Sequence, residues 1–330
     1  MSVTTAREQV LGELREARKL LLTTHENPDG DALGSLLGMH YVLQQVGKDS
    51  VMYMSPEEFP LPWEYRDWHF DDLVGEAPAD VAERTIVFLD CGNIDRMPMD
   101  FLKQDGLHVL NIDHHHDNTH FGTVNLVDPD ASCTAEIVYG LAEELGAEIT
   151  PPIADALYVA LVTDTGRFMY ENTTPEAHAM AGGLIRAGVE PHQVYRRLYE
   201  SLPLARLQLL QRALASLERR DEGALTIACL TREDFEEIGA LETDSEGVVD
   251  HLRALEGTAV AVLVRDLLGD ERQGMRKVSL RATDGRVDVS SIAREFGGGG
   301  HPQAAGFSTA LTYPELIESL REQVGRQLRP

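Results

Sequence analysis

The stretch Leu107-His108-Val109-Leu110-Asn111-Ile112-Asp113-His114-His115-His116 joins a predicted buried strand, Leu107 to Ile112, directly to one carboxylate and three imidazoles. Five of the 12 histidines in the chain lie between His108 and His120. A strand that ends in Asp and His residues is how an α/β protein presents metal ligands at the edge of its sheet. We therefore expect chemistry at the carboxyl end of this strand.

Three further segments place ligand-type side chains where a regular element ends. Lys19 to Thr24 is an apolar strand that leads into His25-Glu26-Asn27-Pro28-Asp29-Gly30-Asp31 and a helix predicted from Ala32 to Val46. Thr85 to Leu89 is a strand that ends on Asp90-Cys91-Gly92, and the helical stretch Ile153 to Val162 ends in Thr163-Asp164-Thr165-Gly166. The candidate ligands, whose number suits two divalent ions, are His25, Asp29, Asp31, Asp90, His114 and Asp164.

Each motif also has a purely structural interpretation. Asn-Pro-Asp-Gly is ordinary turn chemistry, and Asp31 can simply cap the helix that follows it. Asp90-Cys91-Gly92 can do no more than end a buried strand, and Asp164 can cap the next segment. Consecutive histidines also occur in solvated loops, but there they rarely follow an apolar strand directly. Because all four motifs occur in an order that builds one site, we favour a metal centre.

The ordered set His25-x-x-x-Asp29-x-Asp31, Asp90, Asp113-His114-His115 and Asp164 resembles the motifs of the DHH phosphoesterase superfamily. Near the other end, Phe296-Gly297-Gly298-Gly299-Gly300-His301-Pro302-Gln303-Ala304-Ala305-Gly306 resembles the signature of the DHH-associated domain. The pattern is most similar to the stand-alone bacterial type. That type degrades very short oligoribonucleotides (nanoRNase activity) and dephosphorylates 3′-phosphoadenosine 5′-phosphate (pAp).

The resemblance implies a two-metal phosphoesterase that attacks phosphate esters with an activated water, releasing mononucleotides from oligomers and AMP from pAp. His25, Asp29 and Asp90 would hold one ion, and Asp31, Asp90, His114 and Asp164 the other, so that Asp90 bridges both. Carboxylate and imidazole together suit manganese, with magnesium or cobalt as substitutes.

Catalytic roles are implied for Asp90, Asp113, His114 and His115. Asp113 would orient a ligand imidazole, and His115 would contact the substrate phosphate. Further substrate contacts are expected from the second half of the chain, at Gly298, Gly299, Gly300, His301, Arg265, Arg281 and Ser290. The cleft between the two halves would then measure substrate length.

Strands near 19–24, 49–54, 85–90, 107–113 and 123–127 alternate with helical runs up to Ala187, which predicts an α/β fold with a mostly parallel sheet and helices on both faces. We expect three regions: a catalytic metal-binding domain (1–188), a helical linker (189–222) and a smaller α/β substrate-binding domain (223–330). In the last region, strands near 225–230, 258–266 and 275–283 and a helix at 289–296 precede the glycine run.

The composition restricts the substrates. The chain has 29 basic and 55 acidic residues, a formal charge of -26, so it would repel a long polyanion, and no groove for long nucleic acid is expected. Short oligonucleotides and pAp carry few phosphates, which two metal ions and local donors can neutralise. No apolar stretch approaches the roughly 20 residues that span a bilayer. Three scattered cysteines and the lack of a signal peptide favour a cytoplasmic enzyme, and a homodimer is compatible with the sequence.

Three rival functions remain open at this stage. The same motifs permit hydrolysis of the linear dinucleotide pApA in cyclic di-AMP turnover. A pyrophosphatase of the same superfamily would share the first domain, but its second domain carries a basic phosphate-binding segment that this sequence lacks. A nucleic-acid-binding module is the alternative without catalysis, and the intact ligand set and the negative charge disfavour it.

Overall fold

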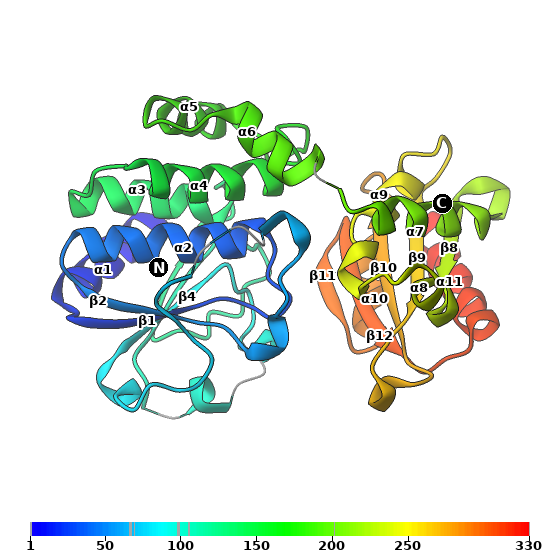
Figure 1. Ribbon diagram of the computed structural model, residues 1–330, viewed down its shortest axis with the longest axis horizontal. Coiled ribbons are helices and arrows are strands. Elements are labelled where there is room, and N and C mark those ends of the chain that lie inside the picture. The colour runs from blue at the N-terminus through cyan, green and yellow to red at the C-terminus, as the bar shows by residue number, and fades with distance from the viewer. Residues whose placement is uncertain are drawn as a thin grey trace. The chain divides into compact units, whose positions relative to one another are not determined.

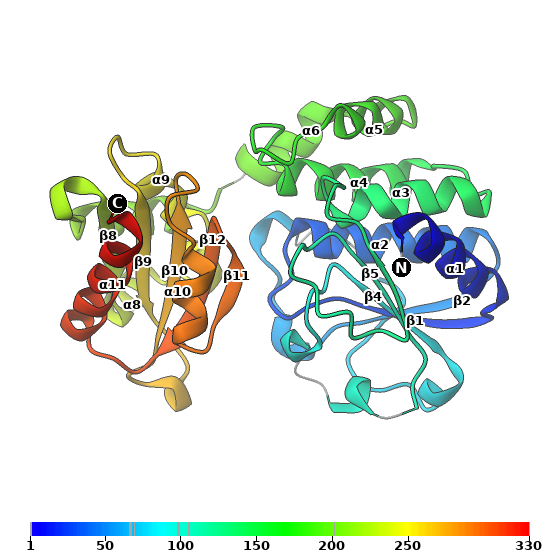
Figure 2. The same cartoon turned by 180° about the vertical axis from the view of Figure 1, so that it is seen from behind.

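The computed structural model describes residues 2–65, 68, 70–97, 100–104, 106–200 and 202–329. They form two compact units, residues 1–200 (unit 1) and 201–330 (unit 2), which are described separately (Figures 1 and 2). Each unit is built on its own sheet, and the predicted α/β class is confirmed. No helix among the described residues is both long and apolar enough to cross a membrane.

The described strands of unit 1 form a parallel sheet in the order β3-β2-β1-β4-β5-β6. Their bounds are β1 (Lys19–Thr23), β2 (Asp49–Tyr53), β3 (Leu73–Val74), β4 (Thr85–Leu89), β5 (Val109–Asp113) and β6 (Val124–Val127). Five of these strands match predicted ones to within two residues at each end, whereas no strand is predicted at the position of β3. Because the strands are parallel, the segments that follow β1, β4 and β5 all leave from one edge of the sheet.

The two faces of this sheet are covered differently. Leu20 and Leu22 point into a core shared with the long helices, whereas Leu21 and Phe88 pack under loops and 3-10 turns that include Leu102. The helices are α1 (Val3–Glu16), α2 (Gly30–Gln45), α3 (Thr134–Leu145), α4 (Pro151–Asp164), α5 (Pro175–Arg186) and α6 (Pro191–Tyr195), which continues into the π-helical turn η6 (Arg196–Glu200). The 3-10 turns are η1 (Pro56–Glu58), η2 (Trp63–Tyr65), η3 (Val81–Glu83), η4 (Ile94–Arg96) and η5 (Asp100–Lys103).

Helices α2 and α4 approach each other closely because three glycines of α2 face α4. A Cβ at Gly34 would lie 2.4 Å from the carbonyl oxygen of Ala156, and one at Gly38 would lie 2.6 Å from Leu157 Cδ2. At the start of α2, a Cβ at Gly30 would collide with Thr163. This contact brings the N-terminus of α2, with Asp31, to the C-terminus of α4, with Asp164.

The described strands of unit 2 form a mixed sheet in the order β11-β12-β10-β9-β8-β7, in which only the pair β8 and β9 is parallel. The strands are β7 (Glu218–Arg220), β8 (Leu225–Leu230), β9 (Val260–Asp266), β10 (Arg276–Ala282), β11 (Gly299–His301) and β12 (Ala304–Thr309). The helices are α7 (Leu204–Ala215), α8 (Arg232–Ile238), α9 (Val248–Arg253), α10 (Val289–Glu295) and α11 (Tyr313–Leu328), with short turns η7 (Asp221–Gly223), η8 (Glu242–Ser245) and η9 (Asp270–Arg272).

The stretch 189–222, predicted as a helical linker, contributes to both units. Val194 and Leu198, in α6 and η6, belong to the core of unit 1. Leu209 and Ala213, in α7, pack in a core of unit 2. The chain therefore passes from one unit to the other near residue 200.

Candidate metal centre

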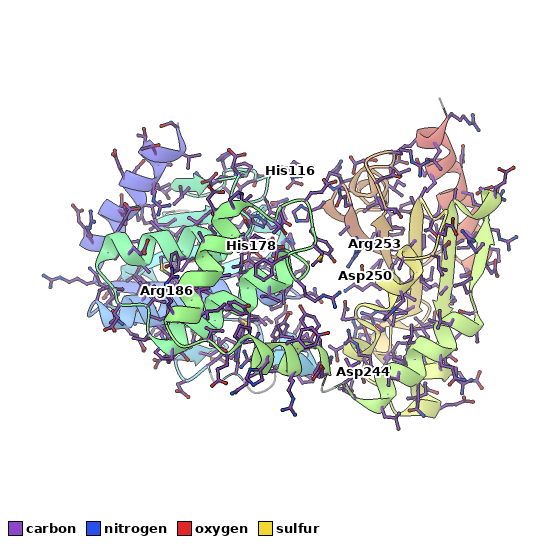
Figure 3. All side chains as sticks on the ribbon, turned by 90° about the horizontal axis from the view of Figure 1, so that it is seen from above. His116, His178, Arg186, Asp244, Asp250 and Arg253 are labelled. Carbon is purple, nitrogen blue, oxygen red and sulfur yellow. The ribbon has the colours of Figure 1, made fainter. Side chains whose placement is uncertain are left out.

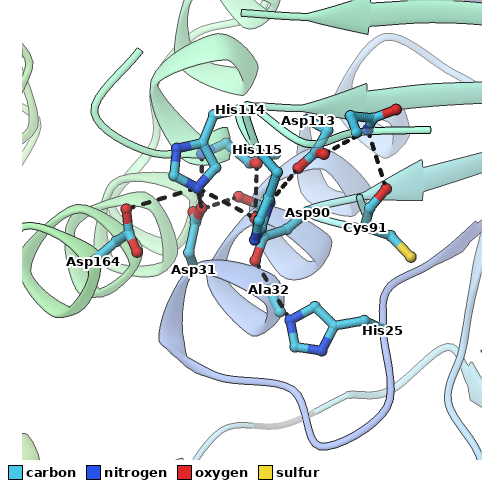
Figure 4. Close-up of polar contacts among 12 residues, drawn as sticks. His25, Asp31, Ala32, Asp90, Cys91, Asp113, His114, His115 and Asp164 are labelled. Atoms are coloured by element: carbon cyan, nitrogen blue, oxygen red, sulfur yellow. Dashed lines mark hydrogen bonds and ion pairs between the residues drawn. The ribbon is translucent and has the colours of Figure 1, made fainter. Parts of the chain in front are cut away.

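Ligand-type side chains from four segments meet at the carboxyl edge of the unit 1 sheet (Figure 4). Among the described residues, three overlapping groups bring potential ligand atoms within 4.8 Å of one another: His25, Asp29 and Asp90; Asp31, His114 and Asp164; and Asp90, His114 and His115. Together they contain all six residues predicted as metal ligands. The arrangement therefore offers two neighbouring positions for a cation.

Asp90 links the groups because its two carboxylate oxygens face different histidines. Oδ2 lies 3.6 Å from His25 Nε2, and Oδ1 lies 3.7 Å from His114 Nε2. Asp90 follows β4 with a φ of 57°, a left-handed conformation that Asp and Asn tolerate better than most residues. The Thr134 hydroxyl donates to Oδ1 at 3.0 Å, which fixes the carboxylate.

Asp31 and Asp29 cap different helices. Asp29 is the N-cap of α2 and accepts from the backbone N–H groups of Asp31 and Ala32. Asp31 instead accepts from the backbone N–H groups of Thr134 at 2.7 Å and Ala135 at 3.0 Å, at the N-terminus of α3. The sequence suggested that Asp31 could cap α2, but in the structure Asp29 caps that helix. Asp31 joins the starts of two helices and is almost fully buried.

Hydrogen bonds also orient the remaining groups of the cluster. The Glu26 carbonyl oxygen lies 2.7 Å from His25 Nδ1, and this contact directs Nε2 of the ring toward Asp90. His25 Nε2 is therefore the ring nitrogen that is placed to bind a metal ion. At the other end of the cluster, the Asn172 side-chain amide donates to Asp164 Oδ2 at 3.0 Å.

Asp113 contacts the second histidine of the motif. His115 Nδ1 lies 2.7 Å from Asp113 Oδ1, and the Asn118 amide donates to Oδ2 at 2.5 Å. The same His115 nitrogen is 3.5 Å from Asp90 Oδ1. Asp113 is fully buried, and its contact with Nδ1 fixes the orientation of the His115 ring.

The carboxylates crowd one another in a region with little solvent. Burial, reinforced by the charges of Asp90 and Asp164, holds the pKa of Asp31 well above its usual range. Burial likewise raises the pKa of Asp164 to about 7. Such repulsion between buried acids is relieved by a bound cation. The oxygen and imidazole donors fit a divalent metal ion.

Nearby histidines lower the pKa of Asp90, in contrast to the raised pKa values of Asp31 and Asp164. Burial alone would raise the pKa of Asp90, but a hydrogen bond from His25 and the charges of His115 and His114 hold it below its ordinary value. His115 is also buried, which opposes its charge, yet the hydrogen bond to Asp113 and the charge of Asp90 raise its pKa to about 9. The acids and imidazoles therefore act as one coupled cluster.

Four contributors to the site were not singled out from the sequence: Thr134, Asn118, Asn172 and Arg96. The first three are ordinary polar residues whose partners lie 44, 5 and 8 positions away. Arg96 places Nη2 2.9 Å from His25 Nδ1 and so brings a positive charge to the cluster. The sequence feature that could have pointed to Arg96 is its position shortly after Asp90, in the turn η4 that follows β4.

The predicted substrate residues of unit 2 have local partners. Arg265 is buried and forms a 2.6 Å ion pair with Glu242, and Ser290 is buried and donates to Asp288. Arg281 Nε lies 3.4 Å from Asp250, which Figure 3 labels. These contacts hold unit 2 together in the described structure.

The glycine run forms β11 and is not an isolated loop. Gly299, Gly300 and His301 pair with β12. A Cβ at Gly298 would lie 2.1 Å from the Gly306 carbonyl oxygen, and Gly300 has a φ of 133°. Close packing on β12 is thus one reason for glycine at positions 298 and 300. Gly299 and Gly300 are exposed.

Comparison with known families identifies the class of protein. The DHH family N-terminal domain matches residues 19–161, and the DHHA1 domain matches residues 227–329. Together with the site described above, these matches show that the chain belongs to the DHH phosphoesterase superfamily.

Similar proteins of known name cover nearly the whole chain. The bifunctional oligoribonuclease and PAP phosphatase NrnA of Thermus thermophilus is 34% identical over 93% of this chain and 90% of its own. The Bacillus subtilis protein of the same name is 26% identical over 88% of each chain.

Solved structures share the fold. An exopolyphosphatase-related protein from Bacteroides fragilis superimposes with a TM-score of 0.84 at 24% identity, covering 98% of this chain and 96% of that one. RecJ from Thermus thermophilus in complex with Mn²⁺ gives a TM-score of 0.58 at 14% identity, over 97% of this chain and 55% of that one.

Proposed function

We propose that the protein is a manganese-dependent phosphoesterase that hydrolyses short oligoribonucleotides to mononucleotides and pAp to AMP. The observation that carries the proposal is the buried cluster in which the two oxygens of Asp90 face His25 and His114. The names of the relatives from Thermus thermophilus and Bacillus subtilis support these two substrates.

Two ligand sets are proposed. His25, Asp29 and Asp90 would hold one ion, and Asp31, His114 and Asp164 would hold the other together with Asp90, whose Oδ1 lies 3.7 Å from His114 Nε2. Bound divalent ions supply positive charge that polarises a phosphoryl oxygen and lowers the pKa of water. Manganese suits this mixture of carboxylate and imidazole donors.

The chain itself provides a positioned donor. Asp113 holds the proton of His115 at Nδ1 and fixes the orientation of the ring, while Asn118 fixes Asp113. His115 would then donate a hydrogen bond to the phosphate and stabilise charge that develops on its oxygens. Arg96, beside His25, would add a second positive group near the same phosphate.

Unit 2 would bind the rest of the substrate. The exposed backbone at Gly299 and Gly300, with Gly298 and His301, is assigned to a terminal phosphate. Arg281 is partly exposed, whereas a substrate contact from Arg265 requires the ion pair with Glu242 to open and Ser290 would have to leave Asp288. Among these residues, His301 is the first to test.

We also propose that the protein is cytoplasmic, because its three free thiols fit the reducing conditions of that compartment.

The direct test is a substrate panel. Protein stripped with a chelator is reloaded with manganese, magnesium or cobalt and incubated with pAp, pApA, RNA of two to twenty nucleotides, and pyrophosphate. We expect activity to return best with manganese and to be highest on pAp and the shortest RNA. Preference for pApA over both would assign the enzyme to cyclic dinucleotide turnover, and activity on pyrophosphate alone would contradict the proposal.

A further inference from the structure

The backbone makes an unusual turn directly after Asp164. Gly166, Arg167 and Phe168 all have positive φ, at 54°, 64° and 64°. Arg and Phe rarely adopt this conformation, and it persists only where surrounding contacts fix it. Such turns are concentrated at sites that bind or react.

Contacts on both sides hold the turn in place. The Arg167 guanidinium lies over the Tyr199 ring at 5.1 Å, and the Phe168 ring stacks on His178, labelled in Figure 3, at 5.0 Å and 22°. The backbone N–H groups of Met169 and Tyr170 both donate to the Thr165 carbonyl oxygen at 3.0 Å. The turn is therefore a defined structure with two anchored side chains.

The next two side chains point outward. Met169 is 82% exposed and Tyr170 is 46% exposed, although both are large and apolar. One face of the Tyr170 ring packs on Gly166, where an added Cβ would lie 2.4 Å from the ring. Asn172 connects the end of the turn to the candidate metal centre, since its amide donates to both the carbonyl oxygen and Oδ2 of Asp164. An exposed aromatic ring and an exposed thioether thus lie on the short segment between the candidate ligand Asp164 and Asn172, which bonds to it.

We infer that Met169 and Tyr170 form a stacking platform for the nucleobase next to the phosphate that is hydrolysed. The inference rests on the proposed function and adds a source of substrate affinity to it. A chain with a formal charge of -26 gains little from general attraction to phosphates, so contact with the uncharged base is the available alternative. Every base offers a flat face to an aromatic ring, so such a platform accepts any sequence. A Met side chain adapts to different base shapes.

The test compares pAp with 3′-phosphoribose 5′-phosphate, which carries the same phosphates without a base. Tyr170→Ala should lower kcat/KM for pAp by roughly five- to a hundredfold, mainly through KM, and leave the compound without a base unchanged. Tyr170→Phe should retain the wild-type preference for pAp. Met169→Ala, a change at a largely exposed side chain, should act in the same direction with a smaller loss. The matched control is Leu214→Ala, because Leu214 is a large exposed apolar side chain (48% exposed) on α7 of unit 2.

The outcomes separate this inference from the proposed function. Equal losses on both compounds in Tyr170→Ala would show that the ring only positions Asp164, and the platform would be wrong while the phosphoesterase assignment stands. A wild-type enzyme that hydrolyses the two compounds equally well would also exclude the platform. Hydrolysis of neither compound by the manganese-loaded wild type would overturn the proposed function and the platform together.

Discussion

The backbone of Gly34 in α2 packs against the carbonyl oxygen of Ala156 in α4, so closely that a Cβ at Gly34 would lie 2.4 Å from that oxygen. The carbonyl belongs to the α4 backbone and cannot rotate away as a side chain can. The separation of the two helices, and with it the distance between Asp31 and Asp164, therefore depends on the absence of a side chain at position 34.

Gly34→Ala should destabilise the protein by about 1–3 kcal/mol because the helices must separate. It should also weaken manganese binding, since Asp31 and Asp164 move apart. Chemical denaturation and metal titration measure both effects. The matched control is Gly12→Ala in α1, where nothing lies within 4 Å of the added carbon and helix propensity predicts a gain of about 0.5–1 kcal/mol. Equal stability of the two variants would contradict the packing argument.

Asp90→Asn should abolish high-affinity binding of both metal ions and reduce turnover by several orders of magnitude. The fold should survive because Asn tolerates the left-handed backbone of residue 90. Metal content per chain, measured beside activity and circular dichroism, tests this prediction. Two retained metals with near-normal rates would show that Asp90 is not the shared ligand.

The stability of the metal-free protein should decrease as pH rises from 5 to 9. Burial raises the pKa of Asp164 to about 7. The contribution of this carboxyl group to the free energy of unfolding is fully present below its pKa in the unfolded chain, which is near 4, and it is lost as pH rises through 7. His115 is buried, which opposes its charge, but Asp113 raises its pKa to about 9, and that contribution is lost as pH rises from about 6.5 through 9. The lowered pKa of Asp90 adds stability that stays constant in this window.

Thermal unfolding in a chelator at several pH values measures this effect. Asp164→Asn is the matched control and should flatten the slope between pH 5 and 7 while leaving the slope above pH 7. With manganese present, the wild-type midpoint should depend much less on pH because the ion neutralises the acids. A midpoint that rises with pH in the chelator is the result that would exclude this electrostatic account.

His301→Ala should lower kcat/KM by about tenfold to a hundredfold, the value of one charge-assisted hydrogen bond to phosphate. Metal content should be unchanged, because His301 lies in β11 of unit 2 and is assigned to substrate. Steady-state kinetics on pAp and metal analysis of the same sample test the prediction. Loss of manganese in this variant would show that unit 2 shapes the metal centre itself.

Efficiency should fall with substrate length. Phosphates beyond those neutralised at the site meet the negative charge of the chain, so two-mers to five-mers and pAp should be processed well and twenty-mers poorly. Added salt should reduce the difference by screening the repulsion. If a twenty-mer is degraded as fast as a three-mer at low salt, the protein is a general exonuclease.

Most strands of the first sheet and the residue types of the candidate site could be predicted from the sequence alone. The predicted strand at residues 225–230 has the observed bounds, because its residues alone carry the apolar pattern of a buried strand. The ligand motifs could be recognised because each follows a strand or ends a helix within a few residues. The carboxyl ends of parallel strands share one edge of the sheet. The proximity of His25, Asp90 and His114 can therefore be predicted without knowledge of side-chain packing.

The partners that hold the predicted site residues in place, in contrast, follow from the packing of distant segments. Asp31 caps α3 from 103 residues away, Thr134 donates to Asp90 from 44 residues away, and Arg265 forms an ion pair with Glu242. Neighbouring positions give no signal for such pairs, because the partners of a buried polar group depend on how separate elements pack. The strained turn after Asp164 is likewise fixed by Tyr199 and His178, and its conformation follows from those contacts.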